Sequence, residues 1–222
     1  MNIGLFVQAI IKYVVGVVIV GSLLFIPATF DYWNGWLFMG LLFIPMFVAG
    51  IFLMIKNPEL LKKRLNAKEK QEKQKQVILF SAVMFISGFI LAGLNYRYKW
   101  VELPNIVVAI SSIVFILAYI LYAEVLRENA YLSRTIEVQD DQQVIDTGLY
   151  GIVRHPMYAV TILLFLTMPL ILGSVFSLII FLFYPIIIAQ RIKNEETILE
   201  KNLKGYLEYK KKVKYKVIPF VW

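Results

Sequence analysis

The sequence predicts an all-α integral membrane protein with about six transmembrane helices, the last two forming a short helical hairpin. Of its 222 residues, 59% are hydrophobic and only 17% are charged, whereas soluble domains average roughly 45–50% apolar and about 25% charged residues. Several apolar runs reach about 20 residues, the length that crosses a bilayer as a helix. The basic residues gather in the segments between alternate runs, as they do in cytoplasmic loops. Together these features exclude a water-soluble enzyme with a single buried core.

The first half of the chain contains four apolar runs, each long enough for one membrane span. We predict these spans at residues 4–30, 36–55, 77–94 and 106–126. They form a predicted four-span membrane scaffold over residues 1–126, with a basic cytoplasmic loop at residues 56–76.

The last apolar run covers residues 159–189, which is too long for one span and too short for two full ones. Pro169 and the pair Gly173-Ser174 interrupt it near the middle. Proline and glycine are tolerated at membrane depth where neighbouring helices satisfy the freed backbone groups. We therefore predict a hairpin with arms at residues 159–172 and 175–189.

The distribution of basic residues predicts the orientation. Of the 23 lysines and arginines, 20 lie in residues 56–75, residues 127–155 and the tail from Arg191 onward. With six alternating spans these three segments share one side of the membrane, which the positive-inside rule makes the cytoplasm. Both termini are then cytoplasmic. The net charge of +8 is explained by this orientation, so nucleic acid is not an expected partner, whereas membrane lipids are.

Residue counts and motifs restrict the chemistry. The chain has no cysteine and a single histidine, His155, which excludes disulfides, thiolate sites and a multi-histidine metal site. It also lacks a P-loop, a Rossmann glycine motif and an H-E-x-x-H motif.

The polar residues of the second half gather in two places. The segment 127–158 is long enough to fold over a site, and Pro156 favours a turn at His155 followed by a helix start. After the hairpin, Arg191 and Glu195 are four residues apart and share a helix face. Taken singly, each feature also fits a structural role: a hydrogen-bonded histidine, a surface ion pair, interfacial tyrosines. The residues alone predict only a polar site on the cytoplasmic face.

Five elements in order extend this interpretation. They are Gly148-x-Tyr150, Arg154-His155-Pro156-x-Tyr158, the apolar hairpin, Arg191-x-x-x-Glu195-Glu196, and Gly205-Tyr206-x-x-Tyr209 with a terminal Ile218-Pro219. This order resembles the isoprenylcysteine carboxyl methyltransferase family, which is related to the phospholipid methyltransferases. The likeness covers roughly residues 127–222, and it departs at Leu149, where the family often has proline.

The resemblance implies an S-adenosyl-L-methionine-dependent methyltransferase region over residues 127–222, with a cytoplasmic cofactor pocket. It implies cofactor binding by the following residues: Gln139, Gln142, Gln143, Val144 and Ile145 on the adenosine side, Tyr150 packed on the cofactor, His155, Pro156, Met157 and Tyr158 at the methionine end, and Glu195 on its amino group. It implies catalytic roles for Arg191 and Glu195, with Arg191 also binding the acceptor. No metal is implied.

The residue types suit methylation of an acid. A carboxylate acceptor is already ionised at pH 7 and needs no general base, and arginine binds it bidentately. The expected acceptor is a lipophilic or prenylated acid, such as an isoprenylcysteine, and the expected location is a bacterial cell membrane. Three alternatives remain open: a phospholipid (ethanolamine) N-methyltransferase, an NADPH-dependent membrane reductase, and a non-catalytic scaffold.

Overall fold

The computed structural model describes residues 3–66, 72–132 and 138–222, and these residues contain helices and no strand. The basic residues Lys68, Lys70 and Arg134 of the predicted cytoplasmic segments lie outside these ranges. The helices are α1 (Ile3–Phe25), α2 (Trp33–Lys56), α3 (Pro58–Leu65), α4 (Glu72–Tyr98), α5 (Asn105–Glu128), the 3-10 turn η1 (Gly148–Gly151), α6 (Pro156–Ile171), α7 (Val175–Phe181), α8 (Tyr184–Asn202) and α9 (Tyr206–Lys212).

Five helical segments of the described residues are long and apolar enough to cross a membrane. They are Ile3–Phe25, Trp33–Lys56, Gln74–Tyr98, Asn105–Glu128 and Val175–Asn202. The first four agree with the predicted spans. The 16 residues of α6 make a shorter apolar helix, so the number of membrane crossings, six in our prediction, remains a prediction.

Prolines and capping residues set several helix boundaries. Pro58 starts α3, and Asn57 accepts a hydrogen bond from the backbone of Leu60, which satisfies one of the free N–H groups of the first turn. Pro156 starts α6, as the sequence predicts. Ser174 caps α7 by accepting from Ser177 N.

The hairpin turn lies where the sequence predicts it, between α6 and α7. Gly173 has a φ of +71°, a conformation that favours glycine. Side chains of α2 and α4 donate hydrogen bonds to backbone carbonyls of this turn: Asn34 Nδ2 donates to Ile171 O at 2.9 Å, and Asn95 Nδ2 donates to Gly173 O at 3.2 Å. The second arm is not one continuous helix, because α7 ends at Phe181 and α8 begins at Tyr184 and runs on to Asn202.

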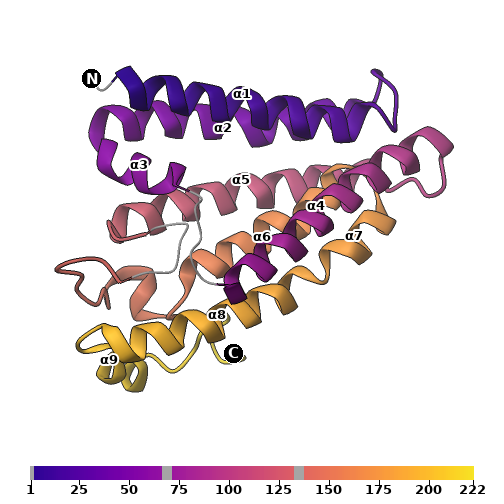
Figure 1. Cartoon of the computed structure of the whole chain (residues 1–222). Helices are drawn as coiled ribbons and strands as arrows, with labels where there is room; N and C mark the ends of the chain where they lie inside the picture. The colour runs from indigo at the N-terminus through magenta and orange to yellow at the C-terminus, as the bar shows by residue number, and fades with distance from the viewer. Residues whose placement is uncertain (1–2, 67–71, 133–137) are drawn as a thin grey trace.

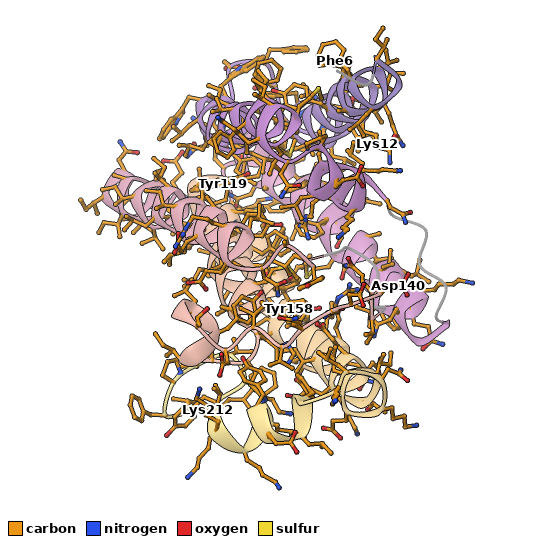
Figure 2. The ribbon with its side chains drawn as sticks, turned by 90° about the vertical axis from the view of Figure 1, so that its left-hand side faces the viewer. Phe6, Lys12, Tyr119, Asp140, Tyr158 and Lys212 are labelled. Carbon is orange, nitrogen blue, oxygen red and sulfur yellow. The ribbon has the colours of Figure 1, made fainter. Side chains whose placement is uncertain are left out.

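The helices form an elongated bundle in which α1 packs on α2, α5 packs on α6, and α4 packs on α7 and α8 (Figure 1). The core between them contains fully buried aromatic side chains, including Phe38, Phe115 and Phe181. The exposed surface of α1 is mostly apolar, as at Phe6, with Lys12 as an exposed charge, whereas Tyr158 lies in the interior and Lys212 on the periphery (Figure 2).

The polar connections gather at one end of this bundle. The helix α3, the end of α5 and α9 lie at the left in Figure 1, whereas the turns after α1 and α4 lie at the opposite end. Hydrogen bonds link α3 to α5 and to the residues after it: Lys63 Nζ donates to Ala130 O at 3.5 Å, and Arg64 donates to the Tyr122 hydroxyl. The predicted basic segments thus share one end of the molecule in the parts that the structure describes.

Candidate active site

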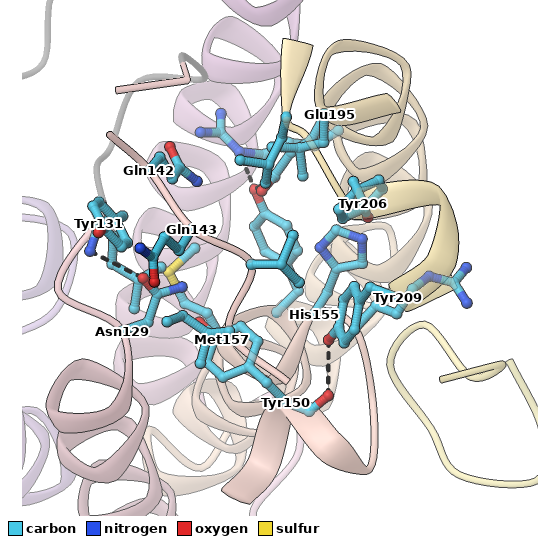
Figure 3. Close-up of a pocket in the computed structure, with 18 residues that line it drawn as sticks. Asn129, Tyr131, Gln142, Gln143, Tyr150, His155, Met157, Glu195, Tyr206 and Tyr209 are labelled. Carbon is cyan, nitrogen blue, oxygen red and sulfur yellow. Dashed lines mark hydrogen bonds between the residues drawn. The ribbon is translucent and has the colours of Figure 1, made fainter. Parts of the chain in front are cut away.

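A pocket opens at this polar end, where the second half of the chain folds over itself. Its walls come from the end of α5, the segment after residue 138, the turn before α6, the face of α8 and the tail (Figure 3). The lining residues are Asn129, Tyr131, Leu132, Gln142, Gln143, Val144, Ile145, Tyr150, Arg154, His155, Met157, Tyr158, Arg191, Glu195, Leu199, Leu203, Tyr206 and Tyr209.

The pocket brings together ten of the twelve site residues that the sequence analysis names. These are Gln142, Gln143, Val144, Ile145, Tyr150, His155, Met157, Tyr158, Arg191 and Glu195. Two residues lie outside the lining. Gln139 donates from Nε2 to Tyr131 O at 2.6 Å and so holds the loop together, and Pro156 forms the first turn of α6.

Glycine is required at position 148 to form the turn before the pocket. Gly148 has a φ of +51°, and a Cβ there would lie 1.5 Å from Oε1 of Glu128. The Glu128 carboxylate accepts from Leu149 N at 3.0 Å through Oε2. The absence of a side chain thus lets a carboxylate at the end of α5 cap the η1 turn, which carries Tyr150 into the pocket wall.

Arg154 joins the turn before α6 to α8 and the tail. Its Nε donates to Glu196 Oε1 at 2.8 Å, and the two side chains are only 4% and 6% exposed. Its NH1 donates to the carbonyls of Val213 and Lys214 at 2.7 and 2.8 Å. Backbone pairing continues this contact, since Arg154 N donates to Tyr215 O at 2.9 Å.

Glu196 also contacts a histidine and a lysine. His155 Nε2 lies 3.3 Å from Glu196 Oε1, and Lys216 Nζ lies 3.5 Å from Oε2. A buried carboxylate is tolerated when it is paired in this way. Glu196 therefore orients His155 and holds the tail in place, although it does not line the pocket. No such role was predicted for Arg154 or Glu196; the signal in the sequence is a pair of adjacent carboxylates, which need cationic partners.

Tyr158 connects the two candidate catalytic residues on α8. Its hydroxyl donates to Glu195 Oε2 at 2.5 Å and accepts from Arg191 Nε at 2.9 Å. Because Arg191 and Glu195 are one turn apart, they face the same tyrosine from α6. One wall of the pocket therefore carries a carboxylate and a guanidinium at fixed separation.

The tail contributes two tyrosines with different hydrogen bonding. Tyr209 donates from its hydroxyl to Tyr150 O at 2.8 Å, a contact drawn in Figure 3. The hydroxyl of Tyr206 is buried and has no hydrogen-bond partner among the described residues. Burial and the nearby carboxylates of Glu196 and Glu195 raise the pKa of the Tyr206 phenol well above its usual value. Tyr206 is therefore a neutral phenol with a free donor in the pocket wall.

Residues 107–201 match the family model described as Isoprenylcysteine carboxyl methyltransferase (ICMT) family. This part of the chain is similar to that family. The match supports a membrane methyltransferase, and it spans α5, the turn before α6, the hairpin and nearly all of α8. No curated protein matches the chain.

The ICMT segment supplies most of the pocket, but three lining residues lie beyond it. These are Leu203, Tyr206 and Tyr209, which the tail folds back over the site. The two tyrosines belong to the sequence motif, but no role was predicted for them. Among the described residues, no group of three or more histidine, cysteine, aspartate or glutamate side chains is placed to hold a metal.

Proposed function

We propose that this protein is an S-adenosylmethionine-dependent methyltransferase that esterifies the carboxylate of a lipophilic acid of the isoprenylcysteine type. The observation that carries the proposal is the junction at Tyr158. Its hydroxyl bonds both Glu195 and Arg191 inside the pocket of the family segment. One carboxylate for a cationic cofactor group and one guanidinium for an anionic acceptor then stand side by side.

The pocket residues fit the cofactor by their chemistry. Glu195 offers a carboxylate for the amino group, and the unpaired hydroxyl of Tyr206 offers a donor for an acceptor atom of the ligand. Tyr150, Leu203 and Val144 offer an aromatic and aliphatic surface for the adenosine. When bound, the cofactor would supply a sulfonium methyl group: the acceptor oxygen would bond to the methyl carbon as the carbon–sulfur bond breaks in line, and the thioether would leave.

The protein's own task is positioning. Arg191 would bind the acceptor carboxylate and align one oxygen, and alignment alone can supply a large share of a displacement barrier. No general base is needed, since the acid is ionised at neutral pH. His155, which is held against Glu196, would shape the cofactor side of the pocket rather than take a proton.

A membrane location suits two reactants of opposite character. The polar cofactor would reach the pocket from the cytosol at the basic end of the bundle, in the orientation predicted by the positive-inside rule. A lipophilic acceptor would arrive sideways between helices. In this arrangement α6 and the α7–α8 arm cross or enter the membrane as a hairpin.

Methyl transfer to a defined acid tests the proposal. Purified protein in detergent would receive methyl-labelled S-adenosylmethionine and an N-acylated S-prenyl cysteine, with the methyl ester of the same compound as the blocked control. The proposal predicts base-labile labelled ester from the acid alone. If phosphatidylethanolamine were labelled and the acid were not, the proposed carboxyl methylation would be wrong and the protein would be an N-methyltransferase.

Arg191→Met sharpens this test. Losing a hydrogen bond to a charged group costs about 1.5–3 kcal/mol, so transfer to the acid should fall by a factor of roughly 10 or more. An unchanged rate would remove Arg191 from the acceptor site.

A further inference from the structure

Gln74 in α4 is a buried polar residue that no part of the proposed mechanism uses. Its side chain is 0% exposed, although it lies near the start of a helix in the half of the chain that the sequence analysis treats as scaffold. The neighbouring Gln76, two residues along, is exposed. Position 74 therefore points into the bundle, towards α8, against which α4 packs.

The contact of Gln74 is with the proposed acceptor-binding arginine. Its Oε1 accepts from NH1 of Arg191 at 3.4 Å, and this bond assigns which end of the amide faces the guanidinium. The other end, Nε2, is buried without a hydrogen-bond partner among the described residues. A side chain that meets Arg191 through its oxygen thus carries two unused N–H donors.

A second unpaired amide lies one helical turn from Arg191. Asn194 accepts through Oδ1 from Gln190 Nε2 at 3.2 Å, and its Nδ2 is buried and unpaired in the described structure. Residues three apart on a helix are neighbours on its surface. Buried amide nitrogens are nearly always hydrogen-bonded in native proteins, so two such orphans beside one arginine need an explanation.

An acceptor carboxylate bound at Arg191 would satisfy the donors of Gln74. An ionised carboxylate accepts at about four lone-pair sites, more than one guanidinium fills. We infer that Gln74 Nε2 donates to the carboxylate of the methyl acceptor together with Arg191, which makes α4 part of the acceptor site. This inference rests on the proposed function and adds a specificity-determining residue from outside the family segment.

The α4 contact also gives the first half of the chain a role in choosing the substrate. A second first-half residue, Arg64 of α3, reaches the site as well, since its NH1 lies 3.9 Å from the sulfur of Met157 in the pocket wall. The acceptor would then lie between the ICMT segment and the N-terminal helices, while the cofactor would contact the ICMT segment and the tail.

The test compares Gln74→Met with Gln76→Met, an exposed control on the same helix. Methionine keeps the length of the side chain and removes both the donors and the Oε1 that accepts from Arg191. For Gln74→Met we expect KM for the acid to rise about tenfold, which corresponds to the loss of about one hydrogen bond to a charged group. Cofactor affinity should stay within about twofold of wild type, and the unfolding temperature should change little, since removing the orphan amide offsets the lost hydrogen bond to Arg191. Gln76→Met should match the wild type throughout.

Three results would overturn the inference. If the wild type is active and the KM of Gln74→Met is unchanged, Gln74 is not part of the acceptor site, and the proposed function stands. A lowered unfolding temperature with weaker cofactor binding gives Gln74 a structural role instead. A wild type that methylates no acid overturns the proposed function and this inference together, and the wild-type measurement therefore separates the two failures.

Discussion

Arg154 and Glu196 form a buried ion pair in which Arg154 Nε lies 2.8 Å from Glu196 Oε1, although the two residues are 42 positions apart. The pair joins the turn before α6 to α8, and through the carbonyls of Val213 and Lys214 it holds the tail. Tyr206 and Tyr209 come shortly before those carbonyls in the chain. The ion pair therefore holds the segment that forms one wall of the pocket, although Glu196 itself does not line the pocket.

Glu196→Gln should therefore destabilise the protein strongly. Removing one partner of a buried pair leaves an uncompensated charge and costs about 3–5 kcal/mol. Thermal unfolding in detergent, with limited proteolysis of the tail, would measure the loss. The double variant Arg154→Met with Glu196→Met should lose less than Glu196→Gln alone, since no buried charge remains. Wild-type stability in Glu196→Gln would show that the ion pair does not hold the tail.

The unpaired hydroxyl of Tyr206 predicts opposite effects on stability and binding. In Tyr206→Phe, the ligand-free protein should gain roughly 1 kcal/mol of stability, because a buried unsatisfied donor is removed. Affinity for S-adenosylmethionine should fall about three- to tenfold, by the loss of one hydrogen bond. Tyr209→Phe is the matched control, since it breaks the bond to Tyr150 O and should lose stability. A Tyr206→Phe protein that is less stable than wild type would contradict the assignment.

Tyr158→Phe tests the junction between Glu195 and Arg191. Phenylalanine keeps the ring and removes both hydrogen bonds, so cofactor affinity and the rate of transfer should both fall, each by about tenfold. Tyr184→Phe loses the bond of its hydroxyl to Thr161 Oγ1 at 3.1 Å outside the pocket lining and should retain both. Equal behaviour of the two variants would mean that the Tyr158 hydroxyl does not organise the site.

Gly148→Ala tests the turn that carries Tyr150. A Cβ would meet the Glu128 carboxylate in a backbone conformation with φ of +51°, so the carboxylate must leave Leu149 N. We expect a loss of at least about 1–2 kcal/mol, from strain and a lost cap. Gly50→Ala in α2 is the control, because a Cβ there meets nothing within 4 Å. Thermal unfolding of the pair would decide, and equal midpoints would refute the steric argument.

Much of the fold was predictable because its signals are local. Apolar runs of span length predict α1, α2, α4 and α5. Gly173-Ser174 marks the hairpin turn, since glycine favours the positive φ found there and serine favours the helix cap that it forms. The break between α7 and α8 was not predicted, because apolar residues continue through it.

The site was predictable only in part, for a physical reason. Ten of the twelve predicted site residues gather in one pocket, but the pairing of Arg154 with Glu196 and the approach of Gln74 to Arg191 depend on tertiary packing. A single sequence does not reveal which of 23 basic residues meets a given carboxylate. The number of membrane crossings, the orientation and the individual roles of the site residues remain predictions.

Cofactor binding in detergent tests the central claim most directly. Calorimetric titration with S-adenosylmethionine, S-adenosylhomocysteine and NADPH would be run on the wild type, Glu195→Ala and His155→Ala. The account predicts saturable binding of both S-adenosyl compounds by the wild type, and its loss in both variants that remain folded by thermal unfolding. Clear binding of NADPH with no binding of either S-adenosyl compound would contradict the account and identify the pocket as that of a membrane reductase.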